Sequence, residues 1–145
     1  MPDPLLEVRD LTVDYVGDNA VFRAVNGIDF DIEAGEAFGL AGESGCGKST
    51  VAFAVARLTR LPGLVSGGSV RFAGEDVLRF NKARLRAYRW REVSFVFQSA
   101  MNALNPVIPI AEQIMDVIET HNPRLGQKGA RKRAMELFEL VGIPP

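Results

Sequence analysis

The feature that most constrains the fold of this chain is a glycine-rich run at residues 42–50, Gly-Glu-Ser-Gly-Cys-Gly-Lys-Ser-Thr. The run satisfies the pattern of a phosphate-binding loop, in which a glycine is followed by four residues and then by Gly-Lys-Ser or Gly-Lys-Thr. Residues 36–41 before it are a mostly apolar run suited to a buried parallel strand, and residues 51–58 after it can continue as a helix. The motif therefore stands between a predicted strand and a predicted helix start, which is the context that anion binding requires.

Each residue type in this run suits the binding of a phosphate chain. A helix start offers unpaired N–H groups and the positive end of the helix dipole, and glycines let the backbone close around the anion. Lys48 is predicted to bind the outer phosphates, Ser49 to offer its hydroxyl to a bridging Mg²⁺ ion, and Thr50 to reach the inner phosphate. The run therefore predicts a nucleoside-triphosphate site. Its expected residues are Gly42, Ser44, Gly45, Cys46, Gly47, Lys48, Ser49 and Thr50.

Composition narrows the class of protein. The chain has 145 residues, of which 47% are hydrophobic and 24% charged, and this is the composition of an ordinary soluble domain. Its net charge of −1 gives no reason to expect a nucleic-acid partner. The start of the chain is acidic, unlike a secretory signal, and no uncharged apolar run is long enough for a membrane span, so we expect a cytosolic protein. The single cysteine, Cys46, is interpreted as a small side chain at a variable loop position, with a redox role as the alternative.

The hydrophobic pattern elsewhere predicts a mixed α/β domain. Residues 6–16 and 21–32 alternate as two neighbouring strands, which indicates an antiparallel piece attached to a parallel core. The later pattern predicts a strand at 69–74, a basic helix at 82–91, a second buried strand at 93–97, a loop at 99–109 and two amphipathic helices that start near 110 and 130. The cations of the basic helix are interpreted as a solvated face, with contact to a phosphate backbone as the alternative.

Five stretches of the sequence together resemble one family. They are residues 5–13, 24–28, 42–50, 67–76 and 97–106. Over nearly all of its length, the chain resembles the ATP-binding subunits of ABC transporters, and more narrowly those of dipeptide and oligopeptide importers. The run Met-Asn-Ala-Leu-Asn-Pro at 101–106 is most typical of the peptide group. Importers of nickel and glutathione share similar runs, so the run leaves the cargo open.

The resemblance implies a fold and roles for particular residues. It implies a phosphate-loop NTPase core with an N-terminal antiparallel β subdomain over residues 1–98, followed at 99–145 by the start of a helical subdomain that is truncated. Tyr15 matches the aromatic residue that stacks on adenine, and Val25 could pad the nucleotide. Gln98 matches the glutamine that reaches Mg²⁺ and the attacking water. Lys48 and Gln98 would be the catalytic residues, and Ser49 and Gln98 the metal ligands.

The resemblance also implies ligands and partners. ATP and Mg²⁺ would bind, and two ATPase subunits, identical or different, would sandwich two ATP molecules. Transmembrane permease subunits would contact residues 99–121, and an extracytoplasmic peptide-binding protein would act indirectly, with no nucleic-acid partner. The protein would lie in the cytoplasm, peripherally on the inner face of the cell membrane.

The chain departs from the family pattern by several absences. Hydrolysis in this family needs an aspartate and a glutamate at the end of a second buried strand, and no apolar strand run here ends in Asp-Glu. The signature helix and the later histidine are also absent, because the triplet Ser66-Gly67-Gly68 leads into a strand pattern instead of a helix. We therefore expect a domain that binds nucleotide and is itself inactive in hydrolysis. The alternatives are a non-transport ABC-type ATPase acting on DNA or ribosomes, and a module that never hydrolyses.

Overall fold

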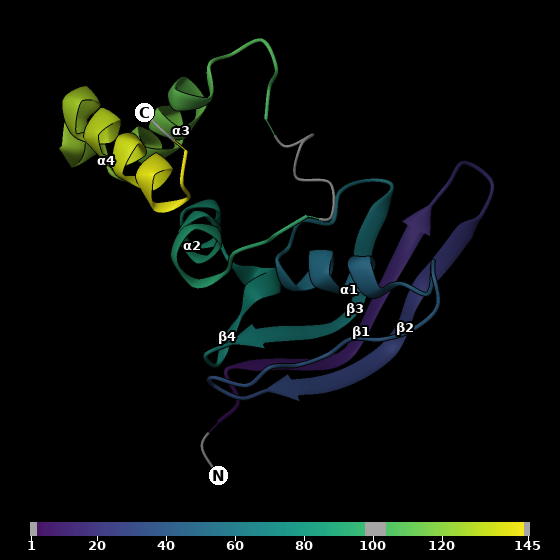
Figure 1. Cartoon of the computed structure of the whole chain (residues 1–145). Helices are drawn as coiled ribbons and strands as arrows, with labels where there is room; N and C mark the ends of the chain where they lie inside the picture. The colour runs from purple at the N-terminus through teal and green to yellow at the C-terminus, as the bar shows by residue number, and fades with distance from the viewer. Residues whose placement is uncertain (1–2, 98–103, 144–145) are drawn as a thin grey trace. The chain divides into compact units, whose positions relative to one another are not determined.

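A computed structural model describes residues 3–97 and 104–143 of the chain. The chain forms two compact units, Met1–Ser94 and Phe95–Pro145. The first unit contains a β-sheet with helices packed against it, and the second consists of helices (Figure 1). Within the described ranges, no helix combines the length and the apolar character that crossing a bilayer requires.

The first unit is built on an antiparallel sheet of four strands in the order β2-β1-β3-β4 (Figure 1). Its strands are β1 (Leu6–Val16), β2 (Val21–Ile32), β3 (Gly63–Phe72) and the short β4 (Glu75–Asp76). β1 lies between β2 and β3 and pairs with both along most of its length. The predicted antiparallel pair at 6–16 and 21–32 is confirmed, and each strand pair among the described residues is antiparallel.

β1 carries the centre of the hydrophobic core on one of its faces. Leu6 and Val8 are buried at even positions, whereas Leu11 and Val13 are buried at odd positions. The alternation of buried residues changes phase at Asp10, which has a φ of 47°. At this residue the register of β1 shifts against both neighbouring strands. This bulge keeps both halves of the strand turned towards the same core.

The triplet Ser66-Gly67-Gly68 lies inside β3, so it does not begin a helix, as the strand pattern predicts. Gly68 has a φ of 81°, and a Cβ at this position would overlap with the backbone carbonyl oxygens of Arg9 and Asp10 at the bulge. The close approach of two strands therefore explains this glycine.

The helix after the glycine-rich run is α1 (Lys48–Val55), which packs on the sheet (Figure 1). Its buried residues are Thr50, Val51 and Ala54. The helix ends at Val55, three residues before the predicted limit, because Arg57 adopts a φ of 51° and turns the chain. The predicted helix is thus confirmed with a shorter C-terminal end.

The predicted basic helix begins as α2 (Lys82–Ala87) and continues as a single π-helical turn, η2 (Tyr88–Glu92), after the short 3-10 turn η1 (Val77–Arg79). Lys82, Arg86, Arg89 and Arg91 are exposed, as the interpretation of a solvated face predicts, whereas Arg84 is half-buried in ion pairs. The Arg84 guanidinium bonds the carboxylates of Glu75 at 2.7 Å and Glu92 at 2.8 Å. This side chain therefore ties β4 to both ends of the helical segment.

The two buried strands predicted at residues 36–41 and 93–97 are wrong. Neither segment forms a strand or a helix. Residues 36–41 are exposed, and the side chain of Val96 is 91% exposed. A strand needs hydrogen-bonded neighbours, and neither segment pairs with another among the described residues. An apolar run is therefore not sufficient to form a buried strand.

The second unit is a pair of helices, α3 (Ile110–His121) and α4 (Gly126–Leu140), joined by the 3-10 turn η4 (Pro123–Leu125). Both helices were predicted from their apolar faces, and both are confirmed. The Gln113 side chain of α3 holds the preceding segment, because its amide bonds the N–H and the carbonyl of Asn105 at 2.8 and 2.9 Å. The small core between the helices consists of Ile118, Ala130 and Ala134, with Ile114, Met115 and Leu137 around them.

Candidate functional site

The glycine-rich run forms a tight loop that leads directly into α1. The N–H of Cys46 donates to the carbonyl of Glu43 at 3.3 Å, which closes a turn over Ser44 and Gly45. Gly47 is the N-terminal cap of α1, with a φ of 96°, and no side chain caps the start of the helix. The first N–H groups of α1 therefore lack a side-chain acceptor at the end of the helix that favours negative charge.

Gly47 is pressed against β2. A Cβ at this position would lie 2.6 Å from the carbonyl oxygen of Ala24 and 3.5 Å from Cγ2 of Val25. Val25 is only 5% exposed, so it supports the loop from the core, and its contact with a nucleotide stays a prediction. Sequence reasoning missed Ala24, because its contact is made by a backbone carbonyl and no side-chain pattern indicates it.

The ammonium group of Lys48 lies within the loop. Its Nζ donates to the carbonyl oxygens of Gly42 at 2.8 Å and Glu43 at 2.6 Å, and it lies 3.5 Å from Sγ of Cys46. The two carbonyls are neutral acceptors, and the ion pairs found in the described part of the chain do not involve Lys48. The loop thus holds a positive charge that forms no ion pair with a carboxylate in the described part of the chain.

Tyr15 and Thr50 meet on the first turn of α1, although they lie far apart in the sequence. Their hydroxyl oxygens are 3.4 Å apart. Thr50 is 9% exposed, and Tyr15 is half-buried where β1 pairs with Gly63 of β3. The structure therefore brings Tyr15 to the helix that carries the loop, and its stacking on adenine stays a prediction.

The predicted metal ligands are described only in part. Gln98 lies outside the described residues, as do residues 99–103 of the predicted contact region for membrane subunits. Ser49 is exposed at the start of α1. Across residues 3–97 and 104–143, no group of three or more His, Cys, Asp or Glu side chains could hold a metal ion. The hydroxyl of Ser49 is therefore the predicted metal ligand for which the structure provides a position.

An ion pair joins the two strands next to the loop. Arg23 of β2 donates from Nε to Oδ1 of Asp14 in β1 at 2.9 Å, and the side chain of Asp14 is 9% exposed. This hydrogen bond, with a smaller contribution from Ser66, lowers the pKa of Asp14 below its ordinary value. Asp14 and Arg23 are the chain neighbours of Tyr15 and Ala24, so the pair holds the backbone that carries both contacts to α1.

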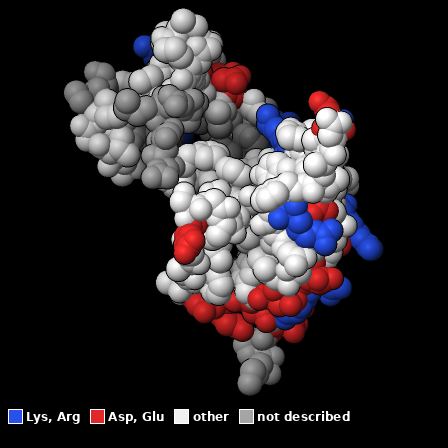
Figure 2. Space-filling model, turned by 90° about the vertical axis from the view of Figure 1, so that its right-hand side faces the viewer, with Lys and Arg blue, Asp and Glu red and all other residues white. Residues whose placement is uncertain are grey.

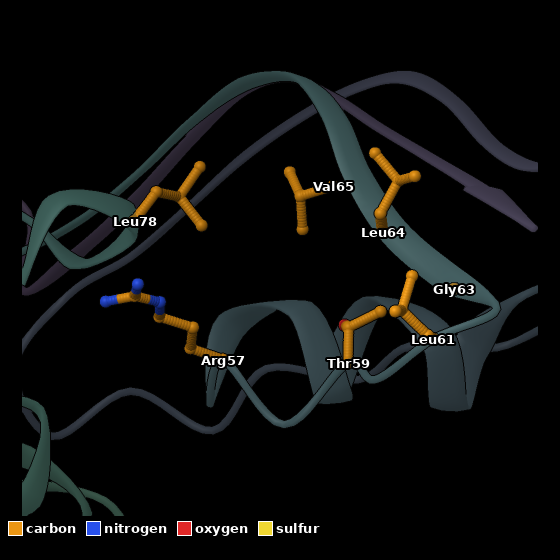
Figure 3. A pocket seen from close by; sticks show the side chains of 7 residues that line it. All are labelled: Arg57, Thr59, Leu61, Gly63, Leu64, Val65 and Leu78. Carbon is orange, nitrogen blue, oxygen red and sulfur yellow. The ribbon is translucent and has the colours of Figure 1, made fainter. Parts of the chain in front are cut away.

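The charge on the surface is mixed. On the face drawn in Figure 2, acidic side chains gather towards the lower end of the view, and Lys and Arg side chains form small separate groups. A cleft of about 360 Å³ lies between β3 and the segment after α1 (Figure 3). Thr59 is one of its lining residues, and the buried hydroxyl of Thr59 has no hydrogen-bond partner among the described residues. The cleft is lined by Arg57, Thr59, Leu61, Gly63, Leu64, Val65 and Leu78. None of the residues predicted for the phosphate site is among them.

The model of the ABC transporter family matches residues 25–145 of the chain. The chain belongs to the ABC transporter family. This match confirms the family predicted from the five resembling stretches, and it includes the glycine-rich loop and both helices of the second unit.

Three curated relatives of this ABC transporter chain are named as ATP-binding proteins of oligopeptide transport or peptide import. It is 45% identical over 141 residues to the oligopeptide transport ATP-binding protein OppD of Mycobacterium bovis. It is 43% identical to a putative peptide import ATP-binding protein of Brucella abortus, and 36% identical to OppD of Bacillus subtilis. Each alignment covers 97% of this chain but only 23%, 42% and 39% of the respective relative. The chain therefore spans less than half the length of these relatives.

The ABC transporter chain also resembles a solved structure, the dimeric structure of a post-hydrolysis state of the ATP-binding cassette MJ0796 bound to ADP and Pi. The TM-score is 0.75 at 22% sequence identity, and the match covers 94% of this chain and 57% of the other. This likeness confirms the predicted α/β fold of an ABC-type ATPase.

Proposed function

We propose that the chain is the nucleotide-binding part of an ATP-binding subunit that drives an importer of peptides. The observation that carries the proposal is the Lys48 ammonium, held at 2.8 and 2.6 Å by two neutral carbonyls of its own loop, at a helix start without a side-chain cap. A positive charge and a set of backbone donors at one place suit a triphosphate chain.

In this proposal, each described residue of the site has one task. Lys48 exchanges its loop carbonyls for the outer phosphates of ATP, while the first N–H groups of α1 bind the phosphate oxygens. Ser49 holds Mg²⁺, which neutralises part of the phosphate charge when bound. Tyr15 offers its ring to the adenine, and its hydroxyl contact with Thr50 keeps that ring close to the loop.

We further propose that the 145 residues bind Mg-ATP and hydrolyse it negligibly. The sequence has no apolar strand run that ends in an acidic pair to hold the metal and polarise water, and removing such groups typically costs orders of magnitude in rate. Turnover comparable to that of an intact ABC ATPase, measured as phosphate release, would contradict this proposal.

The transport role rests on the relatives, which are described as ATP-binding proteins of oligopeptide transport or peptide import. Two subunits would sandwich two ATP molecules and pull on permease subunits through residues 99–121. The subunits would lie at the cytoplasmic face of the membrane, and a separate extracytoplasmic protein would deliver the peptide. Gln98 would link the site to that contact region by reaching Mg²⁺ and the attacking water.

Titration calorimetry with Mg-ATP, Mg-ADP, AMP and adenosine tests the binding proposal. Since the loop recognises phosphates, the affinity should rise with each phosphate, by about tenfold from adenosine to Mg-ATP at the least, which corresponds to about one charge-assisted hydrogen bond. Equal affinity for adenosine and Mg-ATP would contradict a phosphate site.

Uptake measurements test the cargo. In the organism that makes the chain, deleting its gene should abolish uptake of a labelled oligopeptide and leave uptake of nickel and glutathione unchanged. Loss of nickel or glutathione uptake with normal oligopeptide uptake would contradict the peptide assignment. Normal uptake of all three would contradict an importer of this group.

A further inference from the structure

The far end of α1 is tied to the π-helical turn by an unusual set of bonds. After Val55, the helix closes with the N–H of Arg57 on the carbonyl of Ala54 at 2.9 Å and the N–H of Leu58 on the carbonyl of Phe53 at 2.7 Å. This is the Schellman arrangement, whose left-handed residue is usually glycine but here is Arg57, at φ 51°.

The backbone carbonyls of residues 55–57, at the end of α1, accept hydrogen bonds from two side chains of η2. The Tyr88 hydroxyl donates to the carbonyl of Val55 at 3.1 Å. The Arg89 guanidinium donates from Nε to Ala56 at 3.0 Å and from its second nitrogen to Arg57. A helix C-terminus favours a cation, so Arg89 also stabilises the negative end of the dipole of α1.

Two hydrogen bonds also run in the opposite direction, from the end of α1 to the segment around η1. The Arg57 guanidinium donates to the carbonyls of Phe80 at 2.6 Å and Val77 at 3.4 Å. The end of α1 is therefore held by two sets of hydrogen bonds: Arg57 donates to the segment around η1, and Arg89 of η2 donates to the end of α1. These two bonds also offset the strain of Arg57, a non-glycine residue at positive φ.

Both donors from η2 are suited to a permanent contact. Tyr88 has no exposed surface and packs edge-on against the rings of Phe72 and Phe80. Burial raises the pKa of its hydroxyl to about 12, so Tyr88 remains a neutral donor at physiological pH. Burial also lowers the pKa of Arg89, but a guanidinium stays protonated in proteins.

We infer that Tyr88 and Arg89 are positioning residues for the phosphate-binding loop, acting through α1 by fixing its far end. α1 has only eight residues, about 12 Å of helix, and the loop is its direct N-terminal extension. A short helix transmits a tilt at one end to the other, so the anchor at residues 55–57 sets the direction of the N–H groups at its start. The inference rests on the proposed binding of nucleotide at this loop.

Binding by single-residue variants of the 145-residue chain tests the inference. Arg89→Ala should weaken Mg-ATP binding about tenfold and leave adenosine affinity within about twofold, because only the phosphate contacts depend on the tilt of α1. Arg89→Lys, which keeps the charge but has one donating nitrogen in place of two, should recover part of the loss. The matched control is Arg91→Ala, which removes an exposed arginine from the same turn η2 and should bind Mg-ATP like the unaltered chain.

Amide hydrogen exchange separates positioning from general loss of stability. In the Arg89→Ala chain, the amides of residues 47–51 should exchange faster while those of β1 and β3 stay as protected as before. Tyr88→Phe, which removes one oxygen atom, is the milder variant and should show the same pattern more weakly. Uniformly faster exchange in Arg89→Ala, or in Tyr88→Phe where Arg89→Ala does not fold, would overturn the inference.

The outcomes separate the inference from the proposed function. If the unaltered chain binds Mg-ATP no better than adenosine, the proposed function fails, and the inference fails with it. If the unaltered chain prefers Mg-ATP and Arg89→Ala binds it equally well, the proposed function stands and the positioning role is overturned.

Discussion

Replacing Gly47 by alanine tests the geometry of the loop most sharply. Gly47 has a φ of 96°, and a non-glycine residue in such a conformation costs roughly 1–2 kcal/mol. The new Cβ would also lie 2.6 Å from the carbonyl oxygen of Ala24, where an ordinary contact needs at least 3.4 Å, a deficit of about 0.8 Å. That oxygen belongs to the backbone of β2, so the loop must move instead.

The expected consequence is a large loss of phosphate binding. A shift of this size breaks at least one charge-assisted hydrogen bond between a loop amide and phosphate, worth about 1.5–3 kcal/mol. Together with the backbone strain, this predicts that the dissociation constant of Mg-ATP rises about a hundredfold to a thousandfold in Gly47→Ala.

Two neighbouring glycines provide matched controls for this measurement. Gly45 has a φ of 81°, but no atom lies within 4 Å of the position that its Cβ would take, so Gly45→Ala carries strain alone and should weaken binding about tenfold. Gly39 has neither positive φ nor a close neighbour, and Gly39→Ala should bind Mg-ATP normally. If Gly47→Ala binds as tightly as Gly45→Ala, the contact with Ala24 does not shape the loop and the reasoning is refuted.

Two further predictions concern stability. Because Arg23 lowers the pKa of Asp14, the pair stabilises the folded chain above the ordinary carboxyl pKa of about 3.9, and this contribution is lost as the pH falls through the pKa of the folded state. The urea midpoints of the unaltered chain and of Asp14→Asn should therefore differ at pH 7 and converge at acid pH. A difference that persists at acid pH would exclude the ion pair as its source. Ile118 is 5% exposed between α3 and α4, so Ile118→Ala should lower the free energy of unfolding of the second unit by about 2–4 kcal/mol, measured with urea. The control is Val117→Ala, at a position 45% exposed, which should lower it by less than about 1 kcal/mol. Equal losses in the two variants would contradict the described packing.

Local patterns in the sequence were sufficient to predict most of the regular elements. The alternation at 6–16 and 21–32 predicted β1 and β2 and their antiparallel pairing, because the turn between them is short and one face is apolar. The apolar stripes that start near residues 110 and 130 predicted α3 and α4. The small core between these two helices consists of their own residues. These elements satisfy their hydrogen bonds within a short stretch of chain, so nearby residues determine them.

The two wrong strands show where local reasoning ends. Residues 36–41 and 93–97 have apolar strand composition, but a strand forms only beside a partner, and the described residues provide none. The sequence also did not predict the bonds of the exposed Arg89, because a bond from a guanidinium to backbone carbonyls more than thirty positions away leaves no trace in a residue pattern. The loop itself was predictable, since its chemistry lies in consecutive residues.

The most direct test of the account is the affinity of the Lys48→Ala chain for Mg-ATP, measured by titration calorimetry beside the unaltered chain. Since the ammonium is uncompensated in the loop, its loss should weaken Mg-ATP binding about tenfold to a hundredfold, while Lys82→Ala, at an exposed position on α2, should change nothing. If Lys48→Ala binds Mg-ATP as tightly as the unaltered chain, the glycine-rich run is not a triphosphate site, and the proposed role in import loses its basis.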